Sequence, residues 1–290
     1  MNSSSLLSYV TYVYGLAGFL YIFAWVFNLP AAGKTATWIS LVGLAGNIAG
    51  ILLRWIESYR MGIGHAPLSN LYESLVFFAG VITLIYLIIE NRYGNRVIGA
   101  FTMPLAFLAL AYASLPIVSG GVQSLVPALP GVHDRIEPLI PALKSNWLIA
   151  HVLTCFIGYG AFAIAFGVSV MYLLKQFGAG GQNGMLARLP DVSALDELNH
   201  QLIMFGFLFL TAGIITGAVW ANSAWGRYWG WDPKETWSLI TWFIYATLLH
   251  ARMMRGWRGS RIAYLSIGGF VAVLFTYFGV NLLPGLHSYQ

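Results

Sequence analysis

The sequence predicts an all-α polytopic membrane protein, a bundle of about eight transmembrane helices with an extracytoplasmic Trp-rich loop. Of its 290 residues, 58% are hydrophobic and only 9% are charged, and the mean hydropathy is +0.72. Because a water-soluble globular domain carries about 25% charged residues, the composition excludes that class. The apolar runs match the roughly 20 residues that a helix needs to cross about 30 Å of hydrocarbon.

The expected spans follow one another through mostly short connections, in a single integral membrane domain covering residues 1–290. They lie at about 6–28, 38–57, 71–90, 97–115, 147–174, 201–221, 233–252 and 262–283. Two connections are longer than the rest. The segment 116–146 contains five prolines and is expected to be a lid-like surface segment. The segment 175–200 holds a Gly-rich turn and then an expected short interfacial helix from Asp191 to His200.

Loop charge predicts the orientation of the bundle. The connection between the last two spans contains no acidic residue and four arginines, Arg252, Arg255, Arg258 and Arg261. The positive-inside rule places this connection in the cytoplasm. Both termini and the Trp-rich loop then face the extracytoplasmic side, and the first apolar run is expected to be a span and not a removed signal. The net charge of +5 reports this topology, so no nucleic-acid partner is expected.

The Trp-rich loop, residues 222–237, is the most unusual segment of the chain. Four of the eleven tryptophans fall in it, at Trp225, Trp229, Trp231 and Trp237, together with Arg227, Asp232 and Lys234. Part of the loop has a purely structural explanation, because Asp232, Pro233 and Glu235 are typical of the first positions of a helix. Tryptophans also form belts at membrane interfaces. Belt residues are spread over all helix ends, however, whereas these are concentrated at one.

Three histidines lie where they could serve a cofactor. His151 opens the fifth span and His287 follows the eighth, so both flank the Trp-rich loop from separate helices. His250 lies about 17 residues into the seventh helix, roughly 25 Å along its axis, where an ionisable residue tends to mark a functional path. Each also has a structural alternative. A single interfacial histidine is more often solvated than a ligand, and His250 is well placed to cap its helix.

Together these residues fit a flat apolar ligand with carboxylate arms and a central metal. Indole rings supply stacking surface, and Arg227 or Lys234 can pair with carboxylates. Neutral imidazoles are ligands that iron accepts. A porphyrin meets this description better than an ion or a sugar does.

The motif Trp225-Gly-x-x-Trp-x-Trp-Asp-x-Lys-Glu-Thr-Trp237 closely resembles the WWD signature of the cytochrome c assembly (haem-handling) family. Three further segments resemble its CcsA/ResC-type branch, which belongs to the system II pathway of cytochrome c biogenesis. They are Gly64-His-Ala-Pro-Leu-Ser-Asn-Leu-Tyr-Glu-Ser74, Leu143-Lys-Ser-Asn-Trp-Leu-Ile-Ala-His151 and Val280-Asn-Leu-Leu-Pro-Gly-Leu-His-Ser288. The resemblance covers essentially the whole chain.

The resemblance implies that the chain moves haem b to the outer face and presents it for thioether attachment to the Cys-x-x-Cys-His motif of apocytochrome c. It implies His151 and His287 as axial ligands of an outer haem on the WWD loop. His250 would ligate an inner haem, with the second ligand expected from a partner and His200 as the internal fallback. No residue resembles a conventional acid or base, so the chain would be the haem-binding subunit of a cytochrome c synthase (haem lyase) complex.

The resemblance also implies partners and a location. The membrane partner is a ResB-like (CcsB-type) protein. Since the only cysteine, Cys155, can form neither an internal disulfide nor a Cys-x-x-Cys pair, thiol-reducing proteins are expected to act upstream. The expected location is the bacterial plasma membrane in preference to the thylakoid, with the chain in contact with membrane lipid.

Two alternatives stay open. The first is a haem-delivery protein that loads a separate haem chaperone, although the motif at Gly64–Ser74 argues against it. The second is a non-haem transporter whose Trp-rich loop acts as a gate. A transporter would need polar residues along several spans, and apart from Asn47, Glu57 and His250 the expected spans are nearly empty of them.

Overall fold

The computed structural model describes residues 2–125, 131–178 and 184–283. Within these ranges the regular structure is entirely helical, which confirms the predicted all-α membrane class. The α-helices are α1 (Ser3–Phe27), α2 (Pro30–Arg60), α3 (Leu71–Tyr93), α4 (Val97–Ser114), α5 (Pro116–Leu125), α6 (Asn146–Phe177), α7 (Val192–Trp225), α8 (Pro233–Arg255) and α9 (Ser260–Tyr277). Three short 3₁₀ helices are η1 (Pro141–Leu143), η2 (Met185–Arg188) and η3 (Gly279–Leu282).

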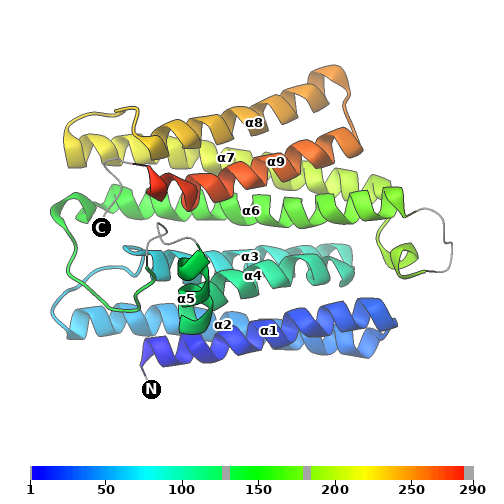
Figure 1. Cartoon of the computed structure of the whole chain (residues 1–290), viewed down its shortest axis with the longest axis horizontal. Helices are drawn as coiled ribbons and strands as arrows, with labels where there is room; N and C mark the ends of the chain where they lie inside the picture. The colour runs from blue at the N-terminus through cyan, green and yellow to red at the C-terminus, as the bar shows by residue number, and fades with distance from the viewer. Residues whose placement is uncertain (1, 126–130, 179–183, 284–290) are drawn as a thin grey trace.

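The long helices lie side by side along one axis, in two groups (Figure 1). Helices α1 to α4 pack against one another, and α6 packs with α7, α8 and α9. Contacts of α3 and α4 with α6 join the two groups. A single buried apolar cluster runs from Leu7 in α1 to Val273 in α9. One continuous core therefore fixes the ends of the helices relative to one another, including the end that carries the Trp-rich loop.

Seven of the described helices are long and apolar enough to cross a membrane, so the chain is an integral membrane protein. The predicted seventh span, now α8, is not among these seven. It is 23 residues long and therefore about 35 Å in length at 1.5 Å per residue. Tryptophan, threonine and charged residues lower its hydropathy. It packs beside α7 and α9 (Figure 1), and its crossing of the membrane stays a prediction.

Several predicted boundaries need correction. Helix α7 begins at Val192, so the expected separate interfacial helix at Asp191–His200 is wrong; it forms the first turns of α7. Arg252 on α8 pairs with Asp196, at 2.7 Å, and holds this part of α7 against the bundle. The expected lid-like segment 116–146 contains helices α5 and η1. Helix α2 starts at Pro30, eight residues before the predicted start, because proline is well suited to the first helical position.

The interior holds more charge than the sequence suggests. Arg54 is 2% exposed inside α2 and forms an ion pair with Glu73 of α3, at 2.7 Å. Glu90, also buried, accepts hydrogen bonds from Tyr21 and Tyr86 at 2.7 and 2.6 Å. Each of these charges is matched by a partner, as a buried charge requires.

Candidate functional site

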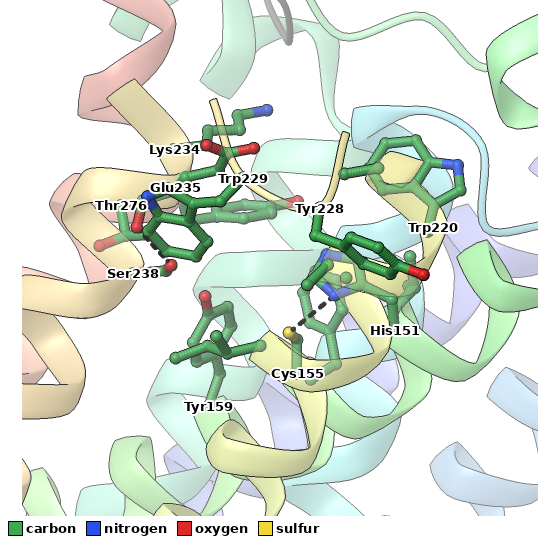
Figure 2. A pocket seen from close by; sticks show the side chains of 17 residues that line it. His151, Cys155, Tyr159, Trp220, Tyr228, Trp229, Lys234, Glu235, Ser238 and Thr276 are labelled. Carbon is green, nitrogen blue, oxygen red and sulfur yellow. Dashed lines mark hydrogen bonds between the residues drawn. The ribbon is translucent and has the colours of Figure 1, made fainter. Parts of the chain in front are cut away.

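A cavity of about 200 Å³ lies between α6, α7, α8 and α9, beneath the segment that joins α7 to α8 (Figure 2). Its walls are mainly aromatic and apolar, with a few polar groups. The residues that line it are His151, Val152, Cys155, Phe156, Tyr159, Ile214, Gly217, Ala218, Trp220, Ala221, Tyr228, Trp229, Lys234, Glu235, Ser238, Thr276 and Tyr277. An apolar cavity with few convergent polar groups is the usual form of a small-molecule site.

Among the described residues, His151 is the histidine that lines this cavity, and its ring is held on two sides. Its Nδ1 lies 2.8 Å from the carbonyl oxygen of Gly213. A carbonyl only accepts, so Nδ1 donates and the neutral ring carries its lone pair on Nε2. Trp220 stacks on the imidazole, with ring centroids 5.9 Å apart and planes inclined by 19°. A backbone carbonyl that fixes the tautomer is the typical support of a metal-ligating histidine.

Glycines on α7 create the space that the His151 ring occupies. A Cβ at Gly217 would lie 2.6 Å from Nδ1 of His151, and one at Gly213 would lie 2.5 Å from Sγ of Cys155. Farther along the same contact, a Cβ at Gly158 would lie 2.9 Å from the carbonyl oxygen of Gly206. Small residues at such spacing allow two membrane helices to approach closely. The close approach of α6 and α7 therefore places His151 against the Gly213 carbonyl.

The connection between α7 and α8 is shorter than the predicted loop, because Trp225 ends α7 and α8 begins at Pro233. Two carboxylates give it its shape. Asp232 accepts from the backbone N–H of Lys234 at 2.9 Å, which confirms the predicted cap. Glu235 accepts from the backbone N–H groups of Gly230 and Asp232, at 2.7 and 3.2 Å. Asp232 and Glu235 thus fix the backbone on which Trp229 sits.

The four loop tryptophans lie in different surroundings. Among them only Trp229 lines the cavity. Trp225 packs edge-on against Trp220 at 5.0 Å, and Trp237 packs on Phe275 at 4.2 Å. Trp231 has a left-handed backbone, with φ of 57°, and is 69% exposed.

Of the two cations that were predicted to bind a ligand, one lines the cavity and the other does not. Lys234 lines the cavity beside Trp229 (Figure 2). Arg227 is exposed, and its guanidinium lies over Gly230, where a Cβ would be 2.8 Å from Cζ. Of these two cations only Lys234 lines the cavity, and Arg227 lies across the loop.

Several lining residues were missed by sequence reasoning. Trp220 is the most important, because it stacks on His151 and its Nε1 donates to the carbonyl of Ala142 at 2.8 Å. Its spacing from Gly213 and Gly217 places it on the same face of α7, a signal that was present in the sequence. Tyr228, Tyr159 and the hydroxyls of α8 and α9 come together only in the folded chain and give no local signal.

Of the other predicted ligands, His287 lies outside the described residues. His250 is exposed near the end of α8, away from the cavity. Arg252, two residues on, faces α7 through its ion pair with Asp196. At 100° per residue His250 lies about 200° from Arg252, on the opposite face of α8. His200 follows Asp196 by four residues and so shares the face that meets Arg252. The two histidines thus point to different sides, which argues against His200 as the internal fallback.

Fold and site together define a polytopic helical membrane protein with an aromatic, histidine-bearing cavity at one end of its bundle. The chain belongs to the cytochrome c assembly family: the family model described as Cytochrome C assembly protein matches residues 68–287. Curated relatives named cytochrome c biogenesis protein CcsA include one from Parasynechococcus marenigrum, 41% identical over 82% of this chain and 81% of the relative. Another, from Synechococcus elongatus, is 39% identical over 90% of this chain and 88% of the relative. These similarities confirm the predicted CcsA-type member and a role in cytochrome c biogenesis.

A solved structure shares the fold. The protein named Cytochrome c Heme Lyase CcmF superimposes with a TM-score of 0.67 at 16% identity, covering 96% of this chain. This chain spans about half, 47%, of that protein. At this identity the likeness shows a common architecture alone.

Proposed function

We propose that the chain binds haem b in the cavity beneath the α7–α8 connection and presents it for attachment to apocytochrome c. The observation that carries this proposal is the environment of His151. Its Nδ1 donates to a backbone carbonyl and its ring stacks on Trp220, inside an aromatic cavity. A neutral imidazole prepared in this way is an axial ligand of iron.

The residues present fit the cofactor in chemistry, and they indicate where the chain has to adjust. Trp220, Trp229 and Tyr228 offer aromatic surface, and Lys234 offers a cation for a carboxylate arm. The cavity of about 200 Å³ is smaller than the roughly 300–1,000 Å³ of typical ligand sites. A porphyrin would need more room, and we propose that the α7–α8 connection, with the exposed Tyr228, moves outward to admit it.

His287 is the proposed second outer ligand. Thr276 and Tyr277 line the cavity, and His287 follows Tyr277 by ten residues. Ten extended residues span at most about 35 Å, so the length of the chain allows His287 to reach the cavity. Ligation from both sides would hold the iron until the substrate histidine replaces one ligand.

Haem, when bound, supplies the vinyl groups to which the two substrate thiols add as thioethers. The chain orients the cofactor, supplies the axial imidazoles and keeps water away with its aromatic walls. We propose a ResB-like (CcsB-type) partner in system II, with thiol-reducing proteins upstream. The exposed face of α8 that carries His250 suits a second ligand contributed by that partner to an inner haem. The plasma membrane, with the α7–α8 connection outside, stays the preferred location over the thylakoid.

Reconstitution tests this function. The chain, its ResB-like partner and an apocytochrome with one Cys-x-x-Cys-His motif are expressed in a host that lacks its own assembly pathway. We expect haem to be found covalently on the cytochrome, and a loss of at least tenfold for His151→Ala, since losing even an outer-shell partner of a metal ligand costs about 10–100-fold. The control, His133→Ala, changes an exposed histidine and should keep full yield. Haem attachment that is indifferent to His151→Ala would overturn the proposal, and haem that appears only on an added chaperone would support the delivery alternative.

A further inference from the structure

The segment 131–140, here called the strap, leads from α5 towards α6 and is gripped through its backbone. Arg54 donates from its two terminal nitrogens to the carbonyls of Asp134 and Arg135, at 2.8 and 3.0 Å. Nδ2 of Asn70 reaches the Arg135 carbonyl at 3.3 Å. Nε2 of His65 lies 3.0 Å from the carbonyl of Glu137. Side chains from α2 and from the connection that leads to α3 thus hold three carbonyls of one segment without regular secondary structure.

Arg54 is arranged for this grip. Its Nε pairs with Glu73 at 2.7 Å, and its guanidinium lies over the ring of Tyr72 at 4.9 Å. A guanidinium that is 2% exposed needs partners for its donors, since an unpaired buried donor is costly. The strap carbonyls provide those partners, so undocking of the strap would leave a buried charge partly unsatisfied.

His65 is engaged at both ring nitrogens. Nδ1 lies 2.9 Å from the carbonyl of Ala66 and Nε2 lies 3.0 Å from that of Glu137. Both ring nitrogens therefore face backbone carbonyls, and the carbonyl of Glu137 belongs to the strap. The strap is the partner that His65 reaches outside its own turn.

The far end of the strap leads to His151. The chain continues into η1, where the carbonyl of Ala142 accepts from Nε1 of Trp220 at 2.8 Å. Trp220 is the residue that stacks on His151. Helix α6, which carries His151, starts directly afterwards, with Ser145 capping it by accepting from the N–H of Trp147 at 3.2 Å. The strap therefore joins the grip on α2 and α3 to two supports of His151.

We propose that Arg54, His65 and Asn70 are positioning residues for His151, which act by docking the strap. This gives a role to the Gly64–Ser74 motif, none of whose residues lines the cavity and of which Ser74 touches its wall through a hydrogen bond with Tyr277. That this positioning matters for the reaction rests on the proposed role of His151 as a haem ligand. The docking of the strap itself does not depend on that role. Only carbonyls of Asp134, Arg135 and Glu137 are used, and their side chains are exposed, so the grip recognises backbone geometry.

The experiment uses two probes that the chain already contains and needs no haem. Trypsin cleavage after Arg135 reports release of the strap, because the carbonyl of Arg135 is held by Arg54 and Asn70. Alkylation of Cys155 by N-ethylmaleimide reports the His151 wall, because its Sγ lies 3.6 Å from Nδ1 of His151. Both rates are measured by mass spectrometry on the full-length protein in detergent. For His65→Gln we expect cleavage to rise about tenfold, the effect of one lost buried hydrogen bond, and alkylation to rise with it.

Two further variants make the result decisive. His133→Gln makes the same chemical change at an exposed histidine of the strap itself and should match the wild type at both probes. Asn70→Asp keeps an oxygen to cap α3 but has no donor for the carbonyl of Arg135, so it should raise both rates even where His65→Gln folds poorly. The proposal is overturned by unchanged cleavage in Asn70→Asp, by cleavage that rises without alkylation, or by an equal effect of His133→Gln. None of these outcomes depends on whether haem binds.

Discussion

The position of His151 depends more on residues of α7 than on its own helix. Gly213 offers the carbonyl that accepts from Nδ1, Gly217 leaves room for the ring, and Trp220 covers it. None of these contacts lies within one turn of His151 in sequence. The imidazole is thus oriented by tertiary packing, which is how a rigid scaffold prepares a ligand before the metal arrives.

Gly217→Ala tests this packing by adding a single methyl group beside the ring of His151. The added Cβ would lie 2.6 Å from Nδ1 of His151, so the ring or α6 has to shift. Overpacking of this kind costs about 1–3 kcal/mol, and we expect the haem content of the purified protein to fall about tenfold, the equivalent of 1.4 kcal/mol. Gly268→Ala adds the same atom on α9, where nothing lies within 4 Å, and should leave haem content unchanged. Equal haem content in the two variants would show that Gly217 is not needed for its small size.

The structure of the junction between α7 and α8 could be predicted from the sequence only in part. Asp232, Pro233 and Glu235 predicted the start of α8, and the structure confirms the cap because the pattern is local. Glu235 also reaches back to Gly230. A carboxylate of this junction therefore has a part in the shape of the cavity wall, beyond its part in starting a helix.

Glu235→Ala removes the acceptor of two backbone N–H groups. The loss of a helix cap costs about 1 kcal/mol, and here the connection that carries Trp229 loses its anchor as well. We expect a lower free energy of unfolding and a lower haem affinity than in the wild type. Glu235→Gln keeps an acceptor oxygen and should recover most of both. Thermal unfolding in detergent, followed by helical circular dichroism, gives the comparison, and a Gln variant as weak as the Ala variant would refute the acceptor role.

Element by element, the sequence predicted what local pattern determines. The apolar runs located eight of the α-helices, and the pattern Asp232, Pro233 and Glu235 located the start of α8. The failures lie where distant segments meet. That Arg54 is buried against Glu73, or that Trp237 turns to Phe275 and away from the cavity, follows from packing between helices. No period in the sequence encodes such pairings.

At the scale of the molecule, the proposed ligands of the outer and the inner haem lie apart. His151 and its cavity lie at the end that carries the α7–α8 connection, whereas His250 lies near the opposite end of α8, which ends at Arg255. The face of α8 with His250 is turned from the α7 contact and exposed. A ligand for a second haem at that position is most readily supplied from outside this chain.

Co-expression tests the dependence on a partner. With the ResB-like partner present, we expect a second haem to co-purify, and to be lost in His250→Ala while the outer haem is kept. Alone, the chain should carry the outer haem only. His200→Ala is the matched control and should have no effect on either haem. His200 lies on the face of α7 that meets Arg252, and His250 lies on the exposed face of α8. Loss of the second haem in His200→Ala would instead support His200 as the second ligand of the inner haem.

The central claim is that His151 ligates haem at the outer cavity, with His287 opposite. The most direct measurement is the absorption spectrum of the purified, haem-loaded protein in the variants His151→Gly and His287→Gly, with and without added imidazole. The account predicts a bis-histidine spectrum in the wild type, its loss in each variant, and its return when imidazole fills the space left by the missing ring. Spectra that are unchanged in both variants would contradict the account.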